Sequence, residues 1–174
     1  MALKFYNTLT REKEIFTPLT AGEVRLYVCG VTVYDSSHVG HARSLITFDV
    51  IFRYLKFSGH RVEFVRNFTN VDDKIINKAV ETQRQAKDVS EEQIRLYYQD
   101  LEALGVAPGD AEPKATDNIP EMIAHIQGLI DKKFAYIADG QASPAGGTAS
   151  SAGRPASPAG GDVYFDVRAF KDYG

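Results

Sequence analysis

VRLYVCGVTVYDSSHVGHARSLITFDVIFRYLKFSGHRVEFV, residues 24–65, contains two strand patterns on either side of a helix pattern. Apolar and polar side chains alternate in VRLYV (24–28), which predicts a strand, and RVEFV (61–65) predicts a second. Between them the spacing is helical, with one face made of Phe48, Ile51, Phe52 and Leu55 and another of Asp49, Arg53 and Lys56. A strand, helix and strand within about 40 residues predict an α/β fold with a right-handed βαβ unit and parallel strands.

The expected ends of this helix follow from its flanking residues. Ser36 or Ser37 is the expected N-cap, since a hydroxyl there can accept a hydrogen bond from a first-turn amide. Ser58-Gly59 is expected to end the helix, because glycine readily adopts the left-handed conformation.

The rest of the chain predicts three more helices and a hairpin. Helices are expected at about 72–85, 90–104 and 118–133. Ser90-Glu91-Glu92-Gln93 resembles a capping box, and Gly105 and Pro108 are expected to close the helix that it opens. FAYIAD (134–139) and DVYFDV (162–167) predict two short strands that pair as a hairpin.

A low-complexity segment, Gly140–Gly161, separates these two strands. It contains 6 Gly, 6 Ala, 4 Ser and 3 Pro, and the hexapeptide ASPAGG occurs twice in it. A segment without large apolar side chains cannot offset its ordering entropy, so it is predicted to be a disordered loop at the hairpin tip without a function of its own. The alternative is a linker-like contact with a partner.

Composition excludes several classes of protein. The 174 residues carry 20 Lys+Arg, 23 Asp+Glu and one Cys, so no disulfide can form within the chain. The sequence has no apolar run of about 18 residues, which argues against a membrane span. The first residues lack the pattern of a signal peptide, and the expected compartment is the cytoplasm, where a lone thiol stays reduced.

His38-Val39-Gly40-His41 stands where the long helix is expected to begin. A helix N-terminus favours phosphate, two imidazoles three residues apart can reach one anion, and Gly40 lets a ligand approach the backbone. This pattern suits attack on the α-phosphate of a nucleotide, where donors stabilise the charge that grows on oxygen. Half of a zinc site, or two solvated histidines at a helix start, are the alternatives that HxGH alone leaves open.

Two further features lie at the same predicted sheet edge. Cys29 follows the first strand, where open α/β sheets bind ligands, although a lone Cys is more often a small buried hydrophobic residue. NFTNVDDK (67–74) follows the second strand, so Thr69 and the two carboxylates could face a shared cleft. Asp72 and Asp73 are also what a helix N-terminus favours.

Taken together, residues 27–79 closely resemble the start of the catalytic domain of cysteinyl-tRNA synthetases, which are class I aminoacyl-tRNA synthetases. HVGH resembles the HIGH motif of that class, YVCG the segment with the first zinc ligand, and NFTNVDDKI the segment lining the amino-acid pocket. The opening KFYNTLTREKEIF and the final GDVYFDVRAFKDYG are also similar to the family. Only Gly140–Gly161 departs from the family's short hairpin turn.

The resemblance implies a Rossmann-type domain that activates L-cysteine with ATP and Mg²⁺ and transfers it to tRNA(Cys). It implies Cys29 as a zinc ligand and His38 and His41 as catalytic contacts to the ATP phosphates. It further implies that Gly40 lies against the adenine and ribose of ATP. Gly30, Thr32, Thr69 and Cys29 would border the cysteine substrate, and neither Asp72 nor Asp73 is given a catalytic role.

Zinc has a physical rationale in such an enzyme. Serine and cysteine differ by one atom, and a pocket that works by size separates such pairs by only about 1–3 kcal/mol. Zinc favours a thiolate over a hydroxyl, so coordination of the substrate sulfur can supply the missing discrimination.

The resemblance also predicts a division of the chain. Residues 1–115 are expected to be the first half of the catalytic domain, and 116–174 the start of a connective segment. The other zinc ligands, the KMSKS loop and the anticodon-binding helices would all lie beyond Gly174, so this chain alone is expected to be inactive. A monomer without membrane contact is the favoured state.

Three alternatives remain open at this point. The first is the related ligase that joins cysteine to an amino-sugar in mycothiol synthesis. The second is a truncated module that binds a nucleotide or a partner without catalysis. A general nucleotidyltransferase is the third, but it leaves YVCG and NFTNVDDK unexplained.

Overall fold

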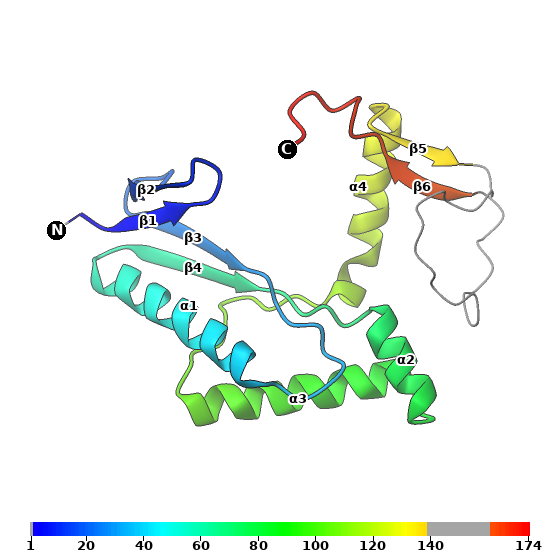
Figure 1. Ribbon diagram of the computed structural model, residues 1–174, viewed down its shortest axis with the longest axis horizontal. Helices are drawn as coiled ribbons and strands as arrows, with labels where there is room; N and C mark the ends of the chain where they lie inside the picture. Colours follow the sequence, from blue (N-terminus) through cyan, green and yellow to red (C-terminus); the bar gives the residue numbers. More distant parts are fainter. Residues whose placement is uncertain (1, 139–160) are drawn as a thin grey trace. The chain divides into compact units, whose positions relative to one another are not determined.

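Two parallel strands, β3 (Glu23–Val28) and β4 (Arg61–Arg66), are joined by helix α1 (Val39–Phe57) in the computed structural model (Figure 1). The model describes residues 2–138 and 161–174. Glu23 pairs with Arg61 and Val28 with Arg66, so the two strands end at the same edge. The βαβ unit predicted from residues 24–65 is therefore confirmed.

A third segment extends this sheet beyond β4. Val65 forms a parallel bridge with Ala111, and Phe68 forms one with Lys114. The amide of Arg66 donates to the carbonyl of Ala111 at 3.0 Å. Residues 110–115 therefore lie beside β4 on the side away from β3, an arrangement that the sequence pattern did not predict.

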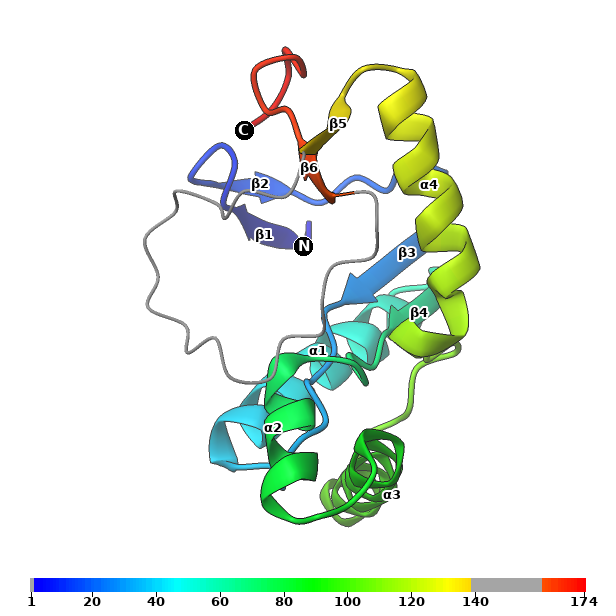
Figure 2. The same cartoon turned by 90° about the vertical axis from the view of Figure 1, so that its right-hand side faces the viewer.

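Three helices cover one side of the strand pair. In both views α1, α2 (Asp73–Glu81) and α3 (Ala86–Leu104) lie on the same side of β3 and β4 (Figures 1 and 2). Two buried clusters fill the space between. The first consists of Val33, Leu45, Phe68, Ile75, Ala79, Val89, Ile94, Tyr97, Leu101 and Val106. The second consists of Val28, Phe52 and Phe64.

The start of α1 differs from the prediction. His38, and not Ser36 or Ser37, is the N-cap: its backbone is extended and its Nδ1 accepts a hydrogen bond from the amide of Gly40. An imidazole nitrogen thus takes the place that a serine hydroxyl was expected to fill. The predicted end is confirmed, since Ser58 is the C-cap and Gly59 has a φ of +89°.

The capping box predicted at Ser90 is wrong. Helix α3 begins four residues earlier, with Gln85 as N-cap and no side-chain cap. Ser90 lies inside the helix, is 1% exposed, and donates from Oγ to the carbonyl of Lys87. Ala86 and Val89 pack against the core, and this packing stabilises an additional turn at the start of the helix. The predicted end at Gly105 is confirmed by its left-handed φ of +66°.

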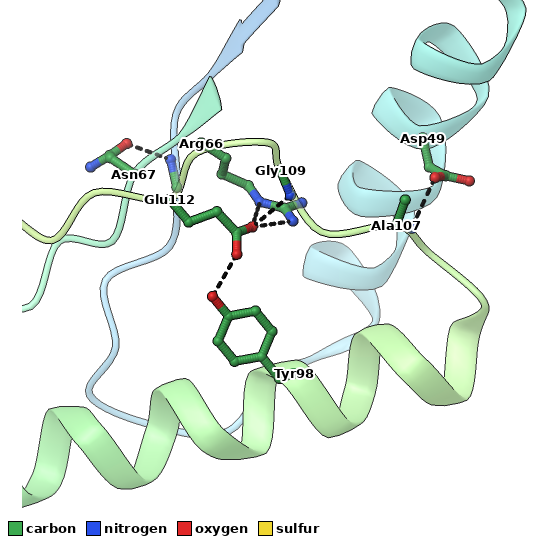
Figure 3. Close-up of polar contacts among 8 residues, drawn as sticks. Asp49, Arg66, Asn67, Tyr98, Ala107, Gly109 and Glu112 are labelled. Atoms are coloured by element: carbon green, nitrogen blue, oxygen red, sulfur yellow. Dashed lines mark hydrogen bonds and ion pairs between the residues drawn. The ribbon is translucent and has the colours of Figure 1, made fainter. Parts of the chain in front are cut away.

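Asp49 was expected on the polar face of α1 and is instead buried. Its Oδ1 accepts a hydrogen bond from the amide of Ala107 at 3.1 Å (Figure 3). Its Oδ2 accepts one from Nε of Arg53 at 2.6 Å. A hydrogen-bonded carboxylate can be buried where an unpaired one cannot. Asp49 therefore ties α1 to the segment that follows α3.

The remaining elements are two hairpins, a short 3-10 turn (Ala115–Asn118) and a helix. The chain forms two compact units, and the first, Met1–Asp117, opens with an antiparallel hairpin of β1 (Lys4–Asn7) and β2 (Glu12–Ile15). The second unit, Asn118–Gly174, contains α4 (Ile119–Asp131) and the antiparallel pair β5 (Ala135–Ala138) and β6 (Asp162–Phe165). This pair confirms the predicted hairpin between 134–139 and 162–167.

Two predictions about the wider chain have different outcomes. The disordered loop expected at 140–161 falls, apart from Gly161, outside the described residues. No helix in the described ranges is long and apolar enough to span a membrane.

Candidate functional site

The two histidines at the start of α1 hold each other in a reciprocal cap. The Nδ1 of His38 accepts from the amide of Gly40 at 3.0 Å, and the amide of His38 donates to the Nδ1 of His41 at 3.2 Å. The two rings stack with centroids 3.9 Å apart. A backbone amide can only donate, so both Nδ1 atoms act as acceptors, and in the neutral rings the proton lies on Nε2.

Electrostatics also favour a neutral His41. Burial, and after it the charge of His38, holds the pKa of His41 below its usual value. With its Nδ1 accepting a hydrogen bond in the cap, each ring leaves Nε2–H as a hydrogen-bond donor at the positive end of the α1 dipole. The geometry therefore suits the binding of a phosphate at this helix start.

Gly40 makes room for this arrangement. A Cβ at this position would lie 2.8 Å from Cε1 of His38 and 3.0 Å from its Nδ1. The absence of a side chain at Gly40 thus serves the ring of His38. Contact between Gly40 and a nucleotide, as implied by the family resemblance, stays a prediction.

A cavity of about 230 Å³ brings together four of the predicted site residues: Cys29, Gly30, Thr32 and His41. They come from the loop that follows β3 and from the first turn of α1. The other lining residues are Val28, Val31, Ser44, Leu45, Phe48, Arg66 and Tyr97. The cavity therefore joins the loop bearing the thiol to the helix start bearing the imidazoles.

His38 and Thr69 do not line this cavity. His38 borders a separate depression between α1 and α3, together with Ser37, Val39, Ala42, Leu45, Asp100, Ala103 and Leu104. Thr69 forms a parallel bridge with Thr32, and its amide donates to the carbonyl of Val31 at 3.2 Å. Thr69 thus stands beside the cavity loop, although it is not among the residues that line the cavity.

Gly30 is in unusually close contact with the chain after β4. A Cβ on Gly30 would lie 1.4 Å from the carbonyl oxygen of Asn67. The amide of Gly30 also donates to Oδ1 of Asn67 at 2.9 Å. The position therefore requires glycine for packing, whatever it contributes to substrate binding.

Cys29 is a free and exposed thiol. Across residues 2–138 and 161–174, no group of three or more His, Cys, Asp and Glu side chains is placed to hold a metal ion. One sulfur donor does not make a zinc site, which needs four ligands. The donors in the described part of the chain therefore do not fit a zinc ion by themselves.

The two acidic residues of NFTNVDDK have a structural explanation. Asp72 is the N-cap of α2, and its Oδ1 accepts from the amide of Lys74 at 2.9 Å. Asp73 stands in the first turn of the same helix, where its charge is favourable. This agrees with giving neither residue a catalytic role.

A buried ion pair forms part of the cavity wall, since Arg66 lines the cavity. Nε and Nη2 of Arg66 donate to Oε1 of Glu112 at 3.2 and 2.7 Å, and the two side chains are 3% and 8% exposed. Oε1 also accepts from the amide of Gly109, and Oε2 accepts from the hydroxyl of Tyr98 at 2.5 Å (Figure 3). Both carboxylate oxygens are satisfied, which is what a buried charge requires.

Tyr97 completes the wall of the cavity. Its ring lies 5.4 Å from the Arg66 guanidinium, and its buried hydroxyl has no hydrogen-bond partner among the described residues. Burial raises the pKa of Tyr97 to about 12, despite the opposing charge of Arg66. The hydroxyl therefore stays protonated at neutral pH.

Comparison with known proteins decides the family. The model of the tRNA synthetases class I (C) catalytic domain matches residues 15–174. This chain belongs to that family. The cysteine–tRNA ligase of Persephonella marina is 49% identical to it over 174 residues, and that of Aquifex aeolicus is 46% identical. The match covers 100% of this chain and 31% of each relative, so the chain spans about a third of their length.

Solved structures support the fold of this class I family. One is the Mycobacterium tuberculosis methionyl-tRNA synthetase in complex with methionyl-adenylate. The aligned region covers 66% of this chain and 23% of that enzyme's chain, with a TM-score of 0.59 and 19% sequence identity. A leucyl enzyme from Agrobacterium radiobacter K84, in a ternary complex described as agnB2 LeuRS-tRNA-LeuAMS, matches 71% of this chain and 16% of its own, with a TM-score of 0.60 and 17% identity. The Rossmann-type α/β class is therefore confirmed.

Sequence reasoning missed several residues around the site of this class I synthetase chain. Arg66 and Glu112 are 46 positions apart, and no local pattern signals that they pair. Tyr97 belongs to an ordinary apolar stripe on α3. Asn67 stood within the quoted motif NFTNVDDK, but its type alone gave it no role.

Proposed function

We propose that this chain is the N-terminal part of a cysteine–tRNA ligase, which activates L-cysteine with ATP and Mg²⁺ and esterifies tRNA(Cys). The cavity that joins Cys29 and Thr32 to His41 at the start of α1 carries this proposal. It sets a soft sulfur donor beside a phosphate-binding helix start, as an enzyme joining cysteine to a nucleotide requires. The relatives named above support the same substrate.

The chain's own residues would act mainly on the activation step. A carboxylate oxygen of cysteine attacks the α-phosphorus of ATP, the bond to pyrophosphate breaks, and cysteinyl-adenylate forms. His38 and His41 would donate hydrogen bonds from Nε2 to phosphoryl oxygens as negative charge grows there. Gly40 would let the nucleotide approach the helix start. A hydroxyl of the terminal adenosine of tRNA(Cys) then attacks the carbonyl carbon, and AMP leaves.

The amino acid would lie near the loop after β3. Cys29, Gly30 and Thr32 line the cavity, and Thr69 stands beside Thr32. Cys29 would be one ligand of a zinc ion that selects the substrate sulfur. The other ligands would come from the part of the relatives' length that this chain does not span. Since the donors described here do not complete such a site, no step above depends on the metal.

The remaining expectations belong to the same proposal. Residues 1–115 would form the first half of the catalytic domain, and 116–174 would begin the connective segment. The enzyme would act in the cytoplasm as a monomer.

The test is cysteine-dependent ATP–pyrophosphate exchange in the intact gene product, after reading the gene beyond codon 174. Exchange with cysteine, little exchange with serine, and release of AMP that requires tRNA(Cys) would support the proposal. AMP release that requires an amino-sugar would point to the mycothiol-type ligase. A stop codon after Gly174, with nucleotide binding but no exchange, would favour the binding module.

The isolated 174-residue chain is expected to show no cysteine-dependent exchange and no stoichiometric zinc. It offers one thiolate where a structural zinc site needs four ligands. Metal analysis after dialysis, together with the exchange assay, checks this. One tightly held zinc per chain would contradict it.

Cys29→Ser in the intact enzyme is expected to remove the zinc and to raise the KM for cysteine by about tenfold or more, which is about 1.4 kcal/mol. A neutral hydroxyl is a much poorer zinc ligand than a thiolate. The KM for ATP should change less than about twofold. Unchanged zinc content in the purified variant would refute the ligand assignment.

His41→Ala is expected to lower the rate of cysteine activation by about 100-fold, because a donor to the developing phosphoryl charge is lost. Cysteine affinity should change little. Single-turnover formation of the adenylate measures the rate, and His125→Ala, at an exposed position on α4, is the control. Equal rates in the two variants would remove His41 from the catalytic step.

A further inference from the structure

The side chain of Asn67 bridges the two chain segments that carry the predicted cysteine-binding residues. Its Oδ1 accepts from the amide of Gly30 at 2.9 Å and from the hydroxyl of Tyr27 at 2.9 Å. Its Nδ2 donates to Oγ1 of Thr69 at 3.3 Å. One amide therefore connects the loop after β3 with the loop after β4.

We propose that Asn67 is a positioning residue of the amino-acid pocket, which holds the Cys29–Gly30 turn and directs the Thr69 hydroxyl toward the substrate. This inference rests on the proposed function. It deepens that function by assigning a role to a side chain that does not line the cavity. The residue would act through Gly30 and Thr69 and not by touching the reacting atoms.

The first half of this role follows from the crowding at Gly30. The carbonyl of Asn67 occupies the space where a Cβ of residue 30 would lie, so the two segments are in backbone contact. Among the described residues, the amide of Gly30 then has one acceptor, the Oδ1 of Asn67. Loss of that acceptor would leave a partly buried amide unpaired and free the turn that carries the Cys29 thiol.

The second half follows from hydrogen-bond polarity. The Nδ2 of Asn67 can only donate, so Oγ1 of Thr69 acts as the acceptor. The hydroxyl proton of Thr69 has no acceptor in the described part of the chain. Thr69 is therefore left as a hydrogen-bond donor to an acceptor atom of the bound amino acid.

The residue directly before Asn67, Arg66, belongs to a buried ion pair. Arg66 is held by two hydrogen bonds to Glu112, and Glu112 is held in turn by Tyr98 and Gly109. Because two N–H groups of Arg66 converge on one carboxylate oxygen that is itself held in place, the end of β4 is anchored one residue before Asn67. The amide of Asn67 is thus presented from a rigid backbone.

Two substitutions separate the two halves. Asn67→Asp keeps an acceptor for the Gly30 amide but cannot donate to Thr69, whereas Asn67→Ala loses both. In the 174-residue chain, hydrogen exchange of the Gly30 amide should stay within about twofold of wild type in the aspartate variant. It should become about tenfold faster in the alanine variant. Equal exchange rates in wild type and Asn67→Ala would overturn the holding role.

A double-mutant cycle in the intact enzyme tests the directing role. Asn67→Asp and Thr69→Val are each expected to raise the KM for cysteine by about tenfold and to leave the KM for ATP within about twofold. If Asn67 acts through Thr69, Asn67→Asp should have little further effect in the Thr69→Val background. Fully additive effects, or equal rises in both KM values, would overturn the directing role.

The control is Asn77→Asp, the same chemical change at an exposed position on α2. It should leave both KM values and the Gly30 exchange rate unchanged. If the intact protein activates no cysteine, the proposed function fails. Gly30 exchange in the shorter chain then still decides whether Asn67 holds the turn.

Discussion

Gly30→Ala is expected to destabilise the first unit by more than about 3 kcal/mol or to prevent it from folding. The added Cβ would lie 1.4 Å from the carbonyl oxygen of Asn67, and backbone cannot yield as the end of a flexible side chain can. This exceeds ordinary overpacking, which costs about 1–3 kcal/mol. Urea unfolding of the 174-residue chain, followed by circular dichroism, measures the loss.

Gly128→Ala is the matched control for this substitution. Gly128 lies in α4, and no heavy atom stands within 4 Å of the position of its added Cβ. Alanine there should be neutral or stabilising by up to about 1 kcal/mol, since it favours the helix. A Gly30→Ala variant as stable as wild type would show that residues 30 and 67 are not in close backbone contact in solution.

Glu112→Ala is expected to lower the free energy of unfolding by about 3–5 kcal/mol, the usual cost of leaving a buried charge without its partner. The substitution removes both hydrogen bonds that Arg66 makes to the carboxylate, as well as the acceptor for Tyr98. Arg66 is 3% exposed in its side chain, so water cannot replace the lost carboxylate without local rearrangement. Chemical denaturation of the variant measures the change.

An exposed ion pair on the same sheet provides the comparison. Arg25 and Glu63 approach to 3.9 Å, with side chains 84% and 65% exposed. Glu63→Ala should therefore cost at most about 1 kcal/mol. Similar losses for Glu112→Ala and Glu63→Ala would mean that the pair in the cavity wall is open to solvent in solution.

Local patterns were enough to predict the β3–α1–β4 unit. Alternation in VRLYV and RVEFV, a helical period between them, and Gly59 at the helix end all describe short-range preferences, and the structure confirms each. Cys29, Gly30 and Thr32 lie in the loop between β3 and α1, and they line one cavity with His41. The cleft that the parallel strands were expected to form between Cys29, Thr69 and the two carboxylates is not found, since neither Thr69, Asp72 nor Asp73 lines that cavity.

Predictions that depended on contacts with distant segments were less successful. Asp49 has the sequence signature of a solvated helix position, but the amide of Ala107 draws it into the interior. The residues around Ser90 match an N-cap pattern, but the packing of Ala86 and Val89 against the core places the start of α3 four residues earlier. In both cases tertiary contacts outweighed a preference worth about 1 kcal/mol.

The sequence by itself determined the α/β class, the order of the elements and the residue types at the helix start, because these depend on periodicity and on motifs read within a few dozen residues. Only the tertiary structure revealed the pair Arg66–Glu112, the amide bridge of Asn67 and the reason for glycine at position 30. Each of these joins segments about 37–46 residues apart, and the free energy of such contacts depends on burial and geometry that no local pattern encodes.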